Sequence, residues 1–165
     1  MAQDLNRPQG ASPARPGVRV TALVSTYHLE LCSAMAASAR EEFLAAGMAP
    51  GDWTELPAPG AFELPILARA AARRDDVDCV LCFGLVLTGE TSHDHWVSMA
   101  ATQGILQASL ETDKPVLFGV LTCQTLEQAR MRALPPSAGG KQDKGREVAR
   151  AALLALDTLD RIQRA

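Results

Sequence analysis

The segment from Gly89 to His93, with the sequence GETSH, combines residue types that can bind an anion and transfer a proton. It closely follows the apolar run from Cys79 to Leu87, which is typical of a buried strand, and it leads into a helical pattern. Free backbone N–H groups at a helix start attract an anion, and the hydroxyls of Thr91 and Ser92 can add bonds to phosphate oxygens. The alternative is that one hydroxyl merely caps the helix. Both interpretations stay open at this point.

Two histidines stand at the start of the same helical pattern, His93 and His95. Two positions apart on a helix, they point about 200° away from each other, so a shared metal ion is not expected and no metal site is predicted. An imidazole titrates near neutral pH, which suits His93, beside the anion site, to proton transfer. A capping or surface role is the alternative for His93. We expect His95 to be structural or to face solvent.

The four cysteines raise the question of a metal site or a disulfide. Cys79 and Cys82 have CxxC spacing, but they lie in an apolar run that reads as a strand. Residues three apart on a strand point to opposite faces, so these two cannot share one zinc ion there. We therefore expect plain buried thiols.

No nucleotide-binding fingerprint is present. The sequence contains no GxGxxG motif. The nearest approach to a P-loop, around Gly140 and Lys141, has Pro135 in place of the first glycine and Gln142 in place of the magnesium-binding hydroxyl.

Strand and helix patterns alternate four times along the chain. The predicted strands are residues 18–24, 53–56, 79–87 and 115–121, and the predicted helices are residues 31–46, 62–73, 92–112, 126–134 and 144–164. Gly47 predicts one helix end, and Thr125 with Gln128 predicts a capping box at the start of another. This order predicts an α/β fold, a three-layer α/β/α sandwich with a four-stranded parallel sheet of the flavodoxin-like kind.

Polar and aromatic residues are concentrated directly after the predicted strands. They occur in residues 25–28, 59–63, 88–93 and 122–125. In an open parallel sheet, ligands bind beyond the carboxyl ends of the strands. The segment GETSH is therefore expected to be a site turn.

Composition predicts one globular domain with a loose arm. Residues 1–17 are rich in Pro, Gly and small polar residues and are expected to form a flexible arm, and residues 18–165 a single domain. A net charge of −3 argues against a nucleic-acid binder. No apolar run approaches the roughly 20 residues that span a bilayer. The first 16 residues have no apolar signal-peptide centre, so a cytoplasmic location is expected.

Several blocks of the sequence together resemble the lumazine synthase family. They are PGAFELP at residues 59–65, GETSH at 89–93, PVLFGVLT at 115–122, LEQA at 126–129 and KG at 144–145. The resemblance runs from about Val18 to the C-terminus. It implies condensation of 5-amino-6-ribitylaminouracil with 3,4-dihydroxy-2-butanone 4-phosphate, without a metal or organic cofactor. The product is 6,7-dimethyl-8-ribityllumazine, formed with loss of phosphate and water.

The resemblance also assigns residues to the two substrates. The substrate-binding positions that it implies are Tyr27, Ala61, Phe62, Glu63, Leu85, Val86, Leu87 and Phe118. Among them, Tyr27 stacks on the pyrimidine, residues 61–63 hold the ribityl chain and border the pyrimidine, and residues 85–87 line the pocket through backbone groups. Phe118 is a pocket wall supplied by the neighbouring subunit.

Phosphate binding and proton transfer are implied at four further positions. Glu90 and Thr91 meet the phosphate, and Arg132 is the phosphate-binding arginine of the neighbouring subunit. His93 matches the proton-transferring histidine. Lys144 matches a lysine before the last helix, to which we assign no role.

Some positions depart from the family pattern. The family's aromatic residue, Phe or Trp, is Tyr27 here, and His28 follows it in place of Asn. Thr88 replaces an arginine beside the phosphate turn, which leaves Arg132 a larger share of the charge. Two other classes remain open, namely a related riboflavin synthase of the archaeal type on the same fold and a non-catalytic binder of lumazines or flavins.

A site that is completed by a neighbour requires a closed ring of subunits, and the resemblance makes this ring a homopentamer. Some family members pack twelve pentamers into a shell through a tight turn before the last helix. Here the turn, residues 134–143, is longer and contains two prolines, which we expect to hold it extended. An isolated pentamer is therefore predicted, ahead of a decamer or a sixty-subunit shell.

Overall fold

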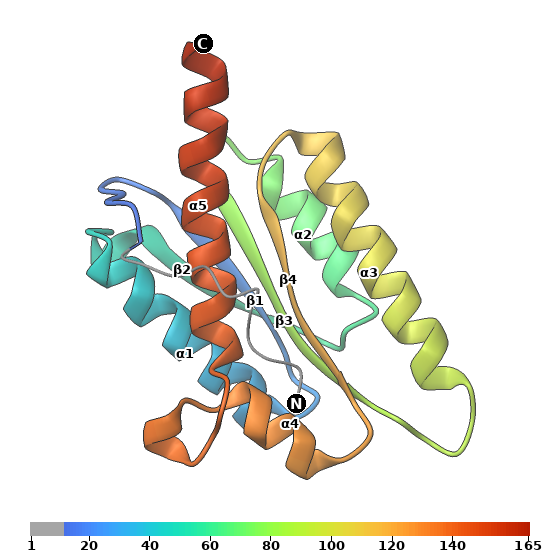
Figure 1. The fold of residues 1–165 in the computed structure, drawn as a ribbon. Helices are drawn as coiled ribbons and strands as arrows, with labels where there is room; N and C mark the ends of the chain where they lie inside the picture. The colour runs from blue at the N-terminus through green and yellow to red at the C-terminus, as the bar shows by residue number, and fades with distance from the viewer. Residues whose placement is uncertain (1–11) are drawn as a thin grey trace.

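The computed structural model describes residues 12–165 and shows a parallel sheet between two layers of helices (Figure 1). The strands are β1 (Val20–Ser25), β2 (Trp53–Ala58), β3 (Cys79–Leu87) and β4 (Val116–Cys123). The helices are α1 (Leu29–Ala45), α2 (Leu64–Ala72), α3 (His93–Thr112), α4 (Leu126–Ala133) and α5 (Lys144–Arg164), with short 3-10 turns η1 (Pro50–Asp52) and η2 (Pro136–Ala138).

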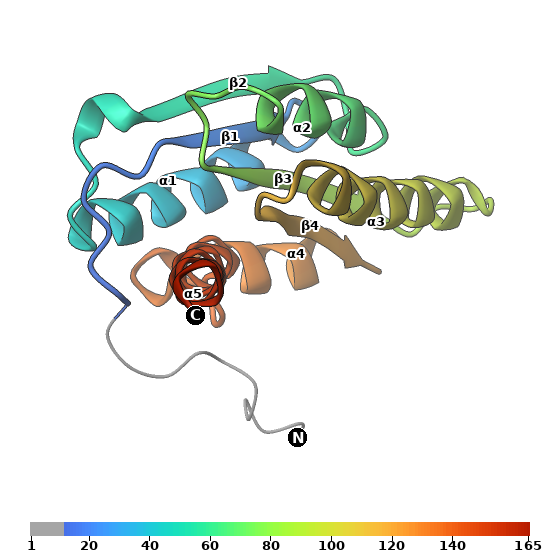
Figure 2. The same cartoon turned by 90° about the horizontal axis from the view of Figure 1, so that it is seen from above.

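The sheet has the strand order β2-β1-β3-β4, and all neighbouring strands are parallel. Viewed from above, α1, α4 and α5 cover one face and α2 and α3 cover the other (Figure 2). The predicted three-layer α/β/α sandwich with a four-stranded parallel sheet is confirmed. Because every strand runs in the same direction, the segments that follow the strands all emerge at one edge, which we call the carboxyl edge.

Strand β3 lies inside the sheet and is buried on both faces, which explains its uninterrupted apolar sequence. Cys79 packs into the core under α1 and α5, whereas Cys82 packs into the core under α2 and α3. The prediction that these two thiols point to opposite faces is confirmed. All four cysteines are free and buried, and burial raises the pKa of the Cys32 thiol to about 12. Among residues 12–165 no group of three potential metal ligands is found.

Local signals account for the end of α1 and the start of α4. Helix α1 ends where Gly47 adopts a φ of 94°, a left-handed conformation that glycine accepts without strain. The Thr125 hydroxyl caps α4 by accepting a bond from the backbone N–H of Gln128 at 3.2 Å. The expected capping box is only half formed, because the Gln128 side chain accepts from the backbone N–H of Gln124 instead.

The turn between α4 and α5 is folded rather than extended. Pro135 is extended, but Pro136 begins η2, and the carbonyl of Pro135 accepts bonds from the backbone N–H groups of Ala138 and Gly140. The expectation that both prolines hold the chain extended is therefore wrong. The fixed φ of proline and its missing N–H also suit the first position of a helical turn, as happens at Pro136.

The described part of the predicted arm contacts the domain. Ser12 donates from its hydroxyl to the carboxylate of Glu42 at 2.6 Å, and the backbone N–H of Arg15 donates to the carbonyl of Ala46 at 2.6 Å. Residues 1–11 of the arm lie outside the described residues. Within the described chain, none of the helices is long and apolar enough to cross a bilayer.

Candidate active site

A cleft of about 760 Å³ opens at the carboxyl edge, where β1, β2 and β3 end. Nine of the twelve residues assigned from the sequence line it, namely Tyr27, Ala61, Phe62, Glu63, Leu85, Val86, Leu87, Thr91 and His93. They come from three separate stretches of the chain, and the parallel sheet brings these stretches together. The remaining three residues, Glu90, Phe118 and Arg132, do not line the cleft of the single chain.

The end of β1 is tied to the end of β2 and presents an aromatic ring to the cleft. The backbone N–H of Thr26 donates to Ala58 at 2.8 Å, and its hydroxyl donates to the carbonyl of Pro59 at 2.9 Å. Tyr27 follows directly, lines the cleft and is 70% exposed. An exposed ring on a fixed backbone offers a flat heterocycle a surface to stack on.

His28 follows in a conformation that few residues adopt. Its φ of 53° and ψ of 44° place it in the left-handed region, directly before α1. Its carbonyl accepts the backbone N–H groups of Leu31 and Cys32, so the first turn of the helix holds the residue in place. His28 lines the cleft beside Tyr27 and adds a second imidazole to that of His93.

The start of α3 supplies unpaired backbone donors. The Thr91 hydroxyl accepts from the backbone N–H of His93 at 3.3 Å, and Ser92 makes no side-chain cap bond. Among residues 12–165, the backbone N–H groups of Asp94 and His95 have no hydrogen-bond acceptor. Such donors, together with the positive end of the helix dipole, favour an anion at this position.

The expected difference between the two neighbouring histidines appears in the geometry. His93 lines the cleft, and His95 does not. The ring of His95 instead packs edge-on against Trp96, with the ring centres 5.0 Å apart. The turn of the helix therefore directs only the first of the two imidazoles to the site.

Sequence reasoning missed part of the cleft wall, namely Asp94, Trp96 and Val97 of α3. A signal for two of them was present, because residues three and four positions after His93 fall on the same helix face. Trp96 and Phe62 are each 60% exposed, so with Tyr27 the cleft carries three large exposed aromatic side chains. A chain with 4% aromatic residues has concentrated them where a planar substrate can be held.

The charge of the cleft is incomplete for a phosphorylated ligand. Of the residues 12–165, its lining includes the carboxylates of Glu63 and Asp94 and no lysine or arginine. Thr88, which stands where the family pattern has an arginine, donates from its backbone N–H to Cys123 at 2.9 Å and so joins the ends of β3 and β4. Lys144 lies elsewhere, at the start of α5, where its ammonium group pairs with Glu147 at 2.8 Å.

Phe118 and Arg132 lie outside the cleft lining of their own chain. Phe118 is on the edge strand β4 and is 37% exposed, and Arg132 is exposed on α4. Among the described residues Arg132 has no carboxylate partner. Its charge is thus available to a ligand. Glu90 is exposed in the turn before α3, outside the cleft lining.

Comparison with known proteins shows similarity over most of the chain. The family model for 6,7-dimethyl-8-ribityllumazine synthase matches residues 17–160. A protein of that name from Thermus thermophilus is 37% identical over 161 residues, which cover 96% of this chain and 99% of the relative. The Clavibacter michiganensis protein of that name is 42% identical over 137 residues, covering 83% and 82% of the two chains. A Caulobacter vibrioides protein named 6,7-dimethyl-8-ribityllumazine synthase 1 is 38% identical, covering 88% and 92%. The chain belongs to the 6,7-dimethyl-8-ribityllumazine synthase family.

Proposed function

We propose that this chain condenses 5-amino-6-ribitylaminouracil (the pyrimidine) with 3,4-dihydroxy-2-butanone 4-phosphate (the butanone phosphate) to give 6,7-dimethyl-8-ribityllumazine in riboflavin biosynthesis. The observation that carries the proposal is the cleft at the carboxyl edge. It combines an exposed aromatic ring at Tyr27, the helix start at residues 91–95 and the imidazole of His93. A stacking surface, an anion site and a proton carrier are what a flat amine and a phosphorylated ketone require.

The reaction depends on proton movement and on holding two molecules together. Amine attack on the ketone, elimination of phosphate and closure of the ring each require a proton to be moved. We assign this transfer to His93, since it lies in the cleft one turn or less from the anion site. Orientation of two reactants can contribute about 7–11 kcal/mol, so most of the rate is expected to come from the shape of the cleft.

Phosphate binding is proposed to need a second subunit. The helix start and the Thr91 hydroxyl can bond phosphate oxygens, but the described part of the chain supplies no guanidinium or ammonium group to its own cleft. A phosphate dianion binds best where such a charge makes direct hydrogen bonds. We therefore assign Arg132 of one subunit, together with Phe118, to the cleft of the next. Both residues are exposed, and neither lines the cleft of its own chain.

The surface of α3 supports an assembly. Only Ala101, Ile105 and Ala108 of its 20 residues are buried. Large apolar side chains are exposed along α3 and the adjoining α2, namely Ile66, Trp96, Met99, Leu106 and Leu110. A patch of this kind is typical of a surface that another protein covers.

Contact between unlike faces of identical subunits closes into a ring when the rotation that relates neighbouring subunits closes on itself. Following the family resemblance, we propose a homopentamer. The longer turn at residues 134–143 is proposed to prevent further packing of pentamers into a shell. Light scattering of the purified protein tests the assembly, with a mass near five chains expected. A mass near one million daltons would show that the turn does not block the shell.

The activity is tested by mixing the purified protein with both substrates and following the absorbance of the lumazine product. Turnover with both substrates, and with neither alone, is the expected result. Tight binding of lumazine or flavin without turnover would identify a binding protein instead. Conversion of the lumazine to riboflavin would identify a riboflavin synthase.

A further inference from the structure

The turn between α4 and α5 returns to contact the residue that we assign to phosphate binding. The Arg132 guanidinium donates from Nη1 to the side-chain oxygen of Gln142 at 3.5 Å. Arg132 is exposed and Gln142 is half-buried. This is the only side-chain hydrogen bond of Arg132 among residues 12–165.

The backbone of Gln142 is held close to Arg132 by the residue before the arginine. The carbonyl of Met131 accepts the backbone N–H of Lys141 at 2.8 Å and that of Gln142 at 3.2 Å. Two bonds to one carbonyl pin the end of the turn to the last turn of α4. The side chain of Gln142 therefore starts from a position fixed relative to the arginine.

The residue after Gln142 is anchored as well. Asp143 is 7% exposed and adopts a φ of 50°. Its carboxylate accepts from the hydroxyl of Ser38 at 2.5 Å and from the backbone N–H of Arg146 at 3.1 Å. Gln142 is thus fixed from both sides, by α4 before it and by α1 and α5 after it. A left-handed, buried aspartate indicates that the path of the chain here is strongly constrained.

The guanidinium of Arg132 also lies close to the end of the sheet, as its effect on Cys123 shows. Burial raises the pKa of the Cys123 thiol, and the nearby charge of Arg132 opposes this increase. Cys123 is the last residue of β4. The arginine therefore lies near the carboxyl end of the edge strand β4.

We propose that Gln142 is a positioning residue that orients the guanidinium of Arg132 toward the phosphate of a neighbouring subunit's cleft. The inference rests on the proposed function. An amide suits the task because its oxygen accepts one N–H and leaves the charge of the guanidinium intact. Arginine has five N–H donors, so four remain for the phosphate. A carboxylate at the same position would hold the arginine but compete with the phosphate for it.

The test compares Gln142→Met and Gln142→Glu with the unchanged enzyme in its assembled form. Methionine has a similar length and only a weak acceptor, whereas glutamate keeps the acceptor and adds a negative charge. We expect Gln142→Met to raise the KM for the butanone phosphate by about 2- to 10-fold, the effect of one modest hydrogen bond. Gln142→Glu should raise this KM further, and the KM for the pyrimidine should not change in either variant. Gln163→Met, at the other edge of the sheet, is the matched control.

The pairing is tested by repeating Gln142→Met in an Arg132→Ala background, where it should add nothing. If Arg132→Ala raises the KM and Gln142→Met or Gln142→Glu leaves it unchanged, the positioning role is wrong while the phosphate assignment stands. If Gln142→Met acts equally in both backgrounds, the glutamine acts through the fold and not through the arginine. If Arg132→Ala itself has no effect, the proposed phosphate site fails first.

Discussion

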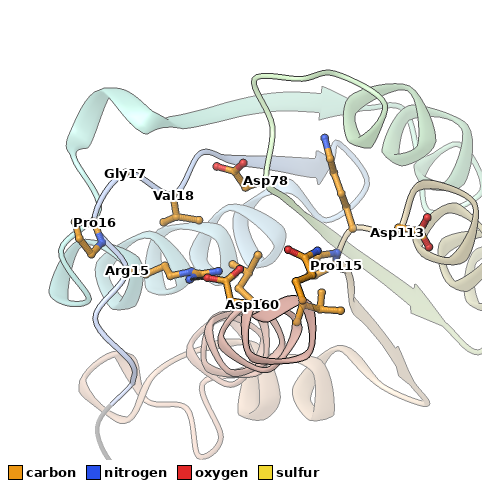
Figure 3. Close-up of a pocket in the computed structure, with 12 residues that line it drawn as sticks. Arg15, Pro16, Gly17, Val18, Asp78, Asp113, Pro115 and Asp160 are labelled. Atoms are coloured by element: carbon orange, nitrogen blue, oxygen red, sulfur yellow. Dashed lines mark hydrogen bonds and ion pairs between the residues drawn. The ribbon is translucent and has the colours of Figure 1, made fainter. Parts of the chain in front are cut away.

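Each end of the sheet carries a hollow, one where the strands begin (the amino edge) and one where they end (the carboxyl edge), but the charged groups of the two are paired differently. The hollow at the amino edge measures about 340 Å³ and lies between residues 15–18, the turn before β4 and the end of α5 (Figure 3). Arg15 reaches across it to Asp160, with nitrogen and oxygen 2.5 Å apart. Asp78 beside it accepts three bonds from Arg19, and the Lys114 ammonium donates to the carbonyls of residues 74 and 77.

At the carboxyl edge the corresponding groups have no such partners. Among residues 12–165, the carboxylates of Glu63 and Asp94 and the ring nitrogens of His93 make no hydrogen bond, and the hydroxyl of Tyr27 makes none. Polar groups that bond one another stabilise the fold, and they would have to give up these bonds to bind a ligand. Polar groups that are held in place without partners are available to a ligand. The difference in pairing, rather than the size of a hollow, distinguishes the proposed site.

The largest effect on substrate use is expected from a substitution at Arg132. A charge-assisted bond is worth about 1.5–3 kcal/mol, so Arg132→Ala should raise the KM for the butanone phosphate by about 10- to 150-fold. The KM for the pyrimidine should change much less. Arg19→Ala removes the same group from the amino edge and is the control, because that guanidinium is already bound to Asp78. Steady-state kinetics with each substrate varied in turn provide the measurement, and an unchanged KM in Arg132→Ala would remove the residue from the site.

The next effect is expected at His93. Acid–base catalysis contributes about 10²–10⁴-fold, and we expect His93→Ala to lower kcat by about 100-fold or less because orientation supplies most of the rate. His95→Ala should be nearly silent, since this ring packs on Trp96 outside the cleft. The kcat values of the two variants, measured at saturating substrates, show which histidine takes part in the reaction. A larger loss in His95→Ala would mean that the wrong face of α3 has been assigned to the substrate.

A smaller effect is expected at Tyr27. Stacking of aromatic rings is worth about 0.5–1.5 kcal/mol, so Tyr27→Ala should raise the Kd for the pyrimidine by about 2- to 12-fold. Tyr27→Phe retains the ring and should bind the pyrimidine as well as the unchanged chain does. Titration with the pyrimidine alone, by calorimetry, measures both variants. Equal losses in the two would point to the hydroxyl and against stacking.

The smallest effect concerns the amino edge and should spare activity altogether. Burial raises the pKa of Asp78, but the bonds from Arg19 outweigh it and leave this pKa lowered. The stabilisation is therefore present above the ordinary pKa of an aspartate, about 3.9, and is lost as the pH falls through the lowered value in the folded state. The pair is partly exposed, so Asp78→Asn should reduce the free energy of unfolding by at most about 1 kcal/mol at neutral pH.

This difference should vanish in acid, which unfolding curves at several pH values would show. Kinetics at neutral pH should be unchanged. A loss of activity in Asp78→Asn without unfolding would contradict the division between the two edges.

Sequence patterns predicted the elements well where a single strong signal acts. The bounds of β3 and α5 agree with the prediction residue for residue. In β3 the whole run is apolar. Helix α5 begins at Lys144, directly after its N-cap residue Asp143. Strand β1 begins two residues later than predicted, at Val20. Arg19, which precedes it, is engaged by Asp78, a residue 59 positions away that no local pattern reveals.

The same distinction applies to the site. Six of the nine cleft residues follow predicted strands, and the carboxyl ends of parallel strands meet at one edge, so their neighbourhood was predictable. The other three, Leu85, Val86 and Leu87, were assigned through the family resemblance alone. The contact between Arg132 and Gln142 was not, since it depends on η2 folding the turn back onto α4. Nor does a pattern within one chain test the proposal that Arg132 serves the cleft of a neighbouring subunit.

The claim that the site is shared between subunits is tested most directly by mixing two damaged chains. His93→Ala and Arg132→Ala each leave one half of the proposed site intact. In a mixed ring at equal amounts, about one quarter of the sites should combine an intact cleft with an intact neighbouring arginine. Co-expressed and assayed at a low concentration of butanone phosphate, the mixed enzyme should therefore recover activity toward a quarter of the unchanged level. Activity equal to the average of the two separate variants would contradict the account, because it would show that both residues serve the same subunit's site or that Arg132 serves none.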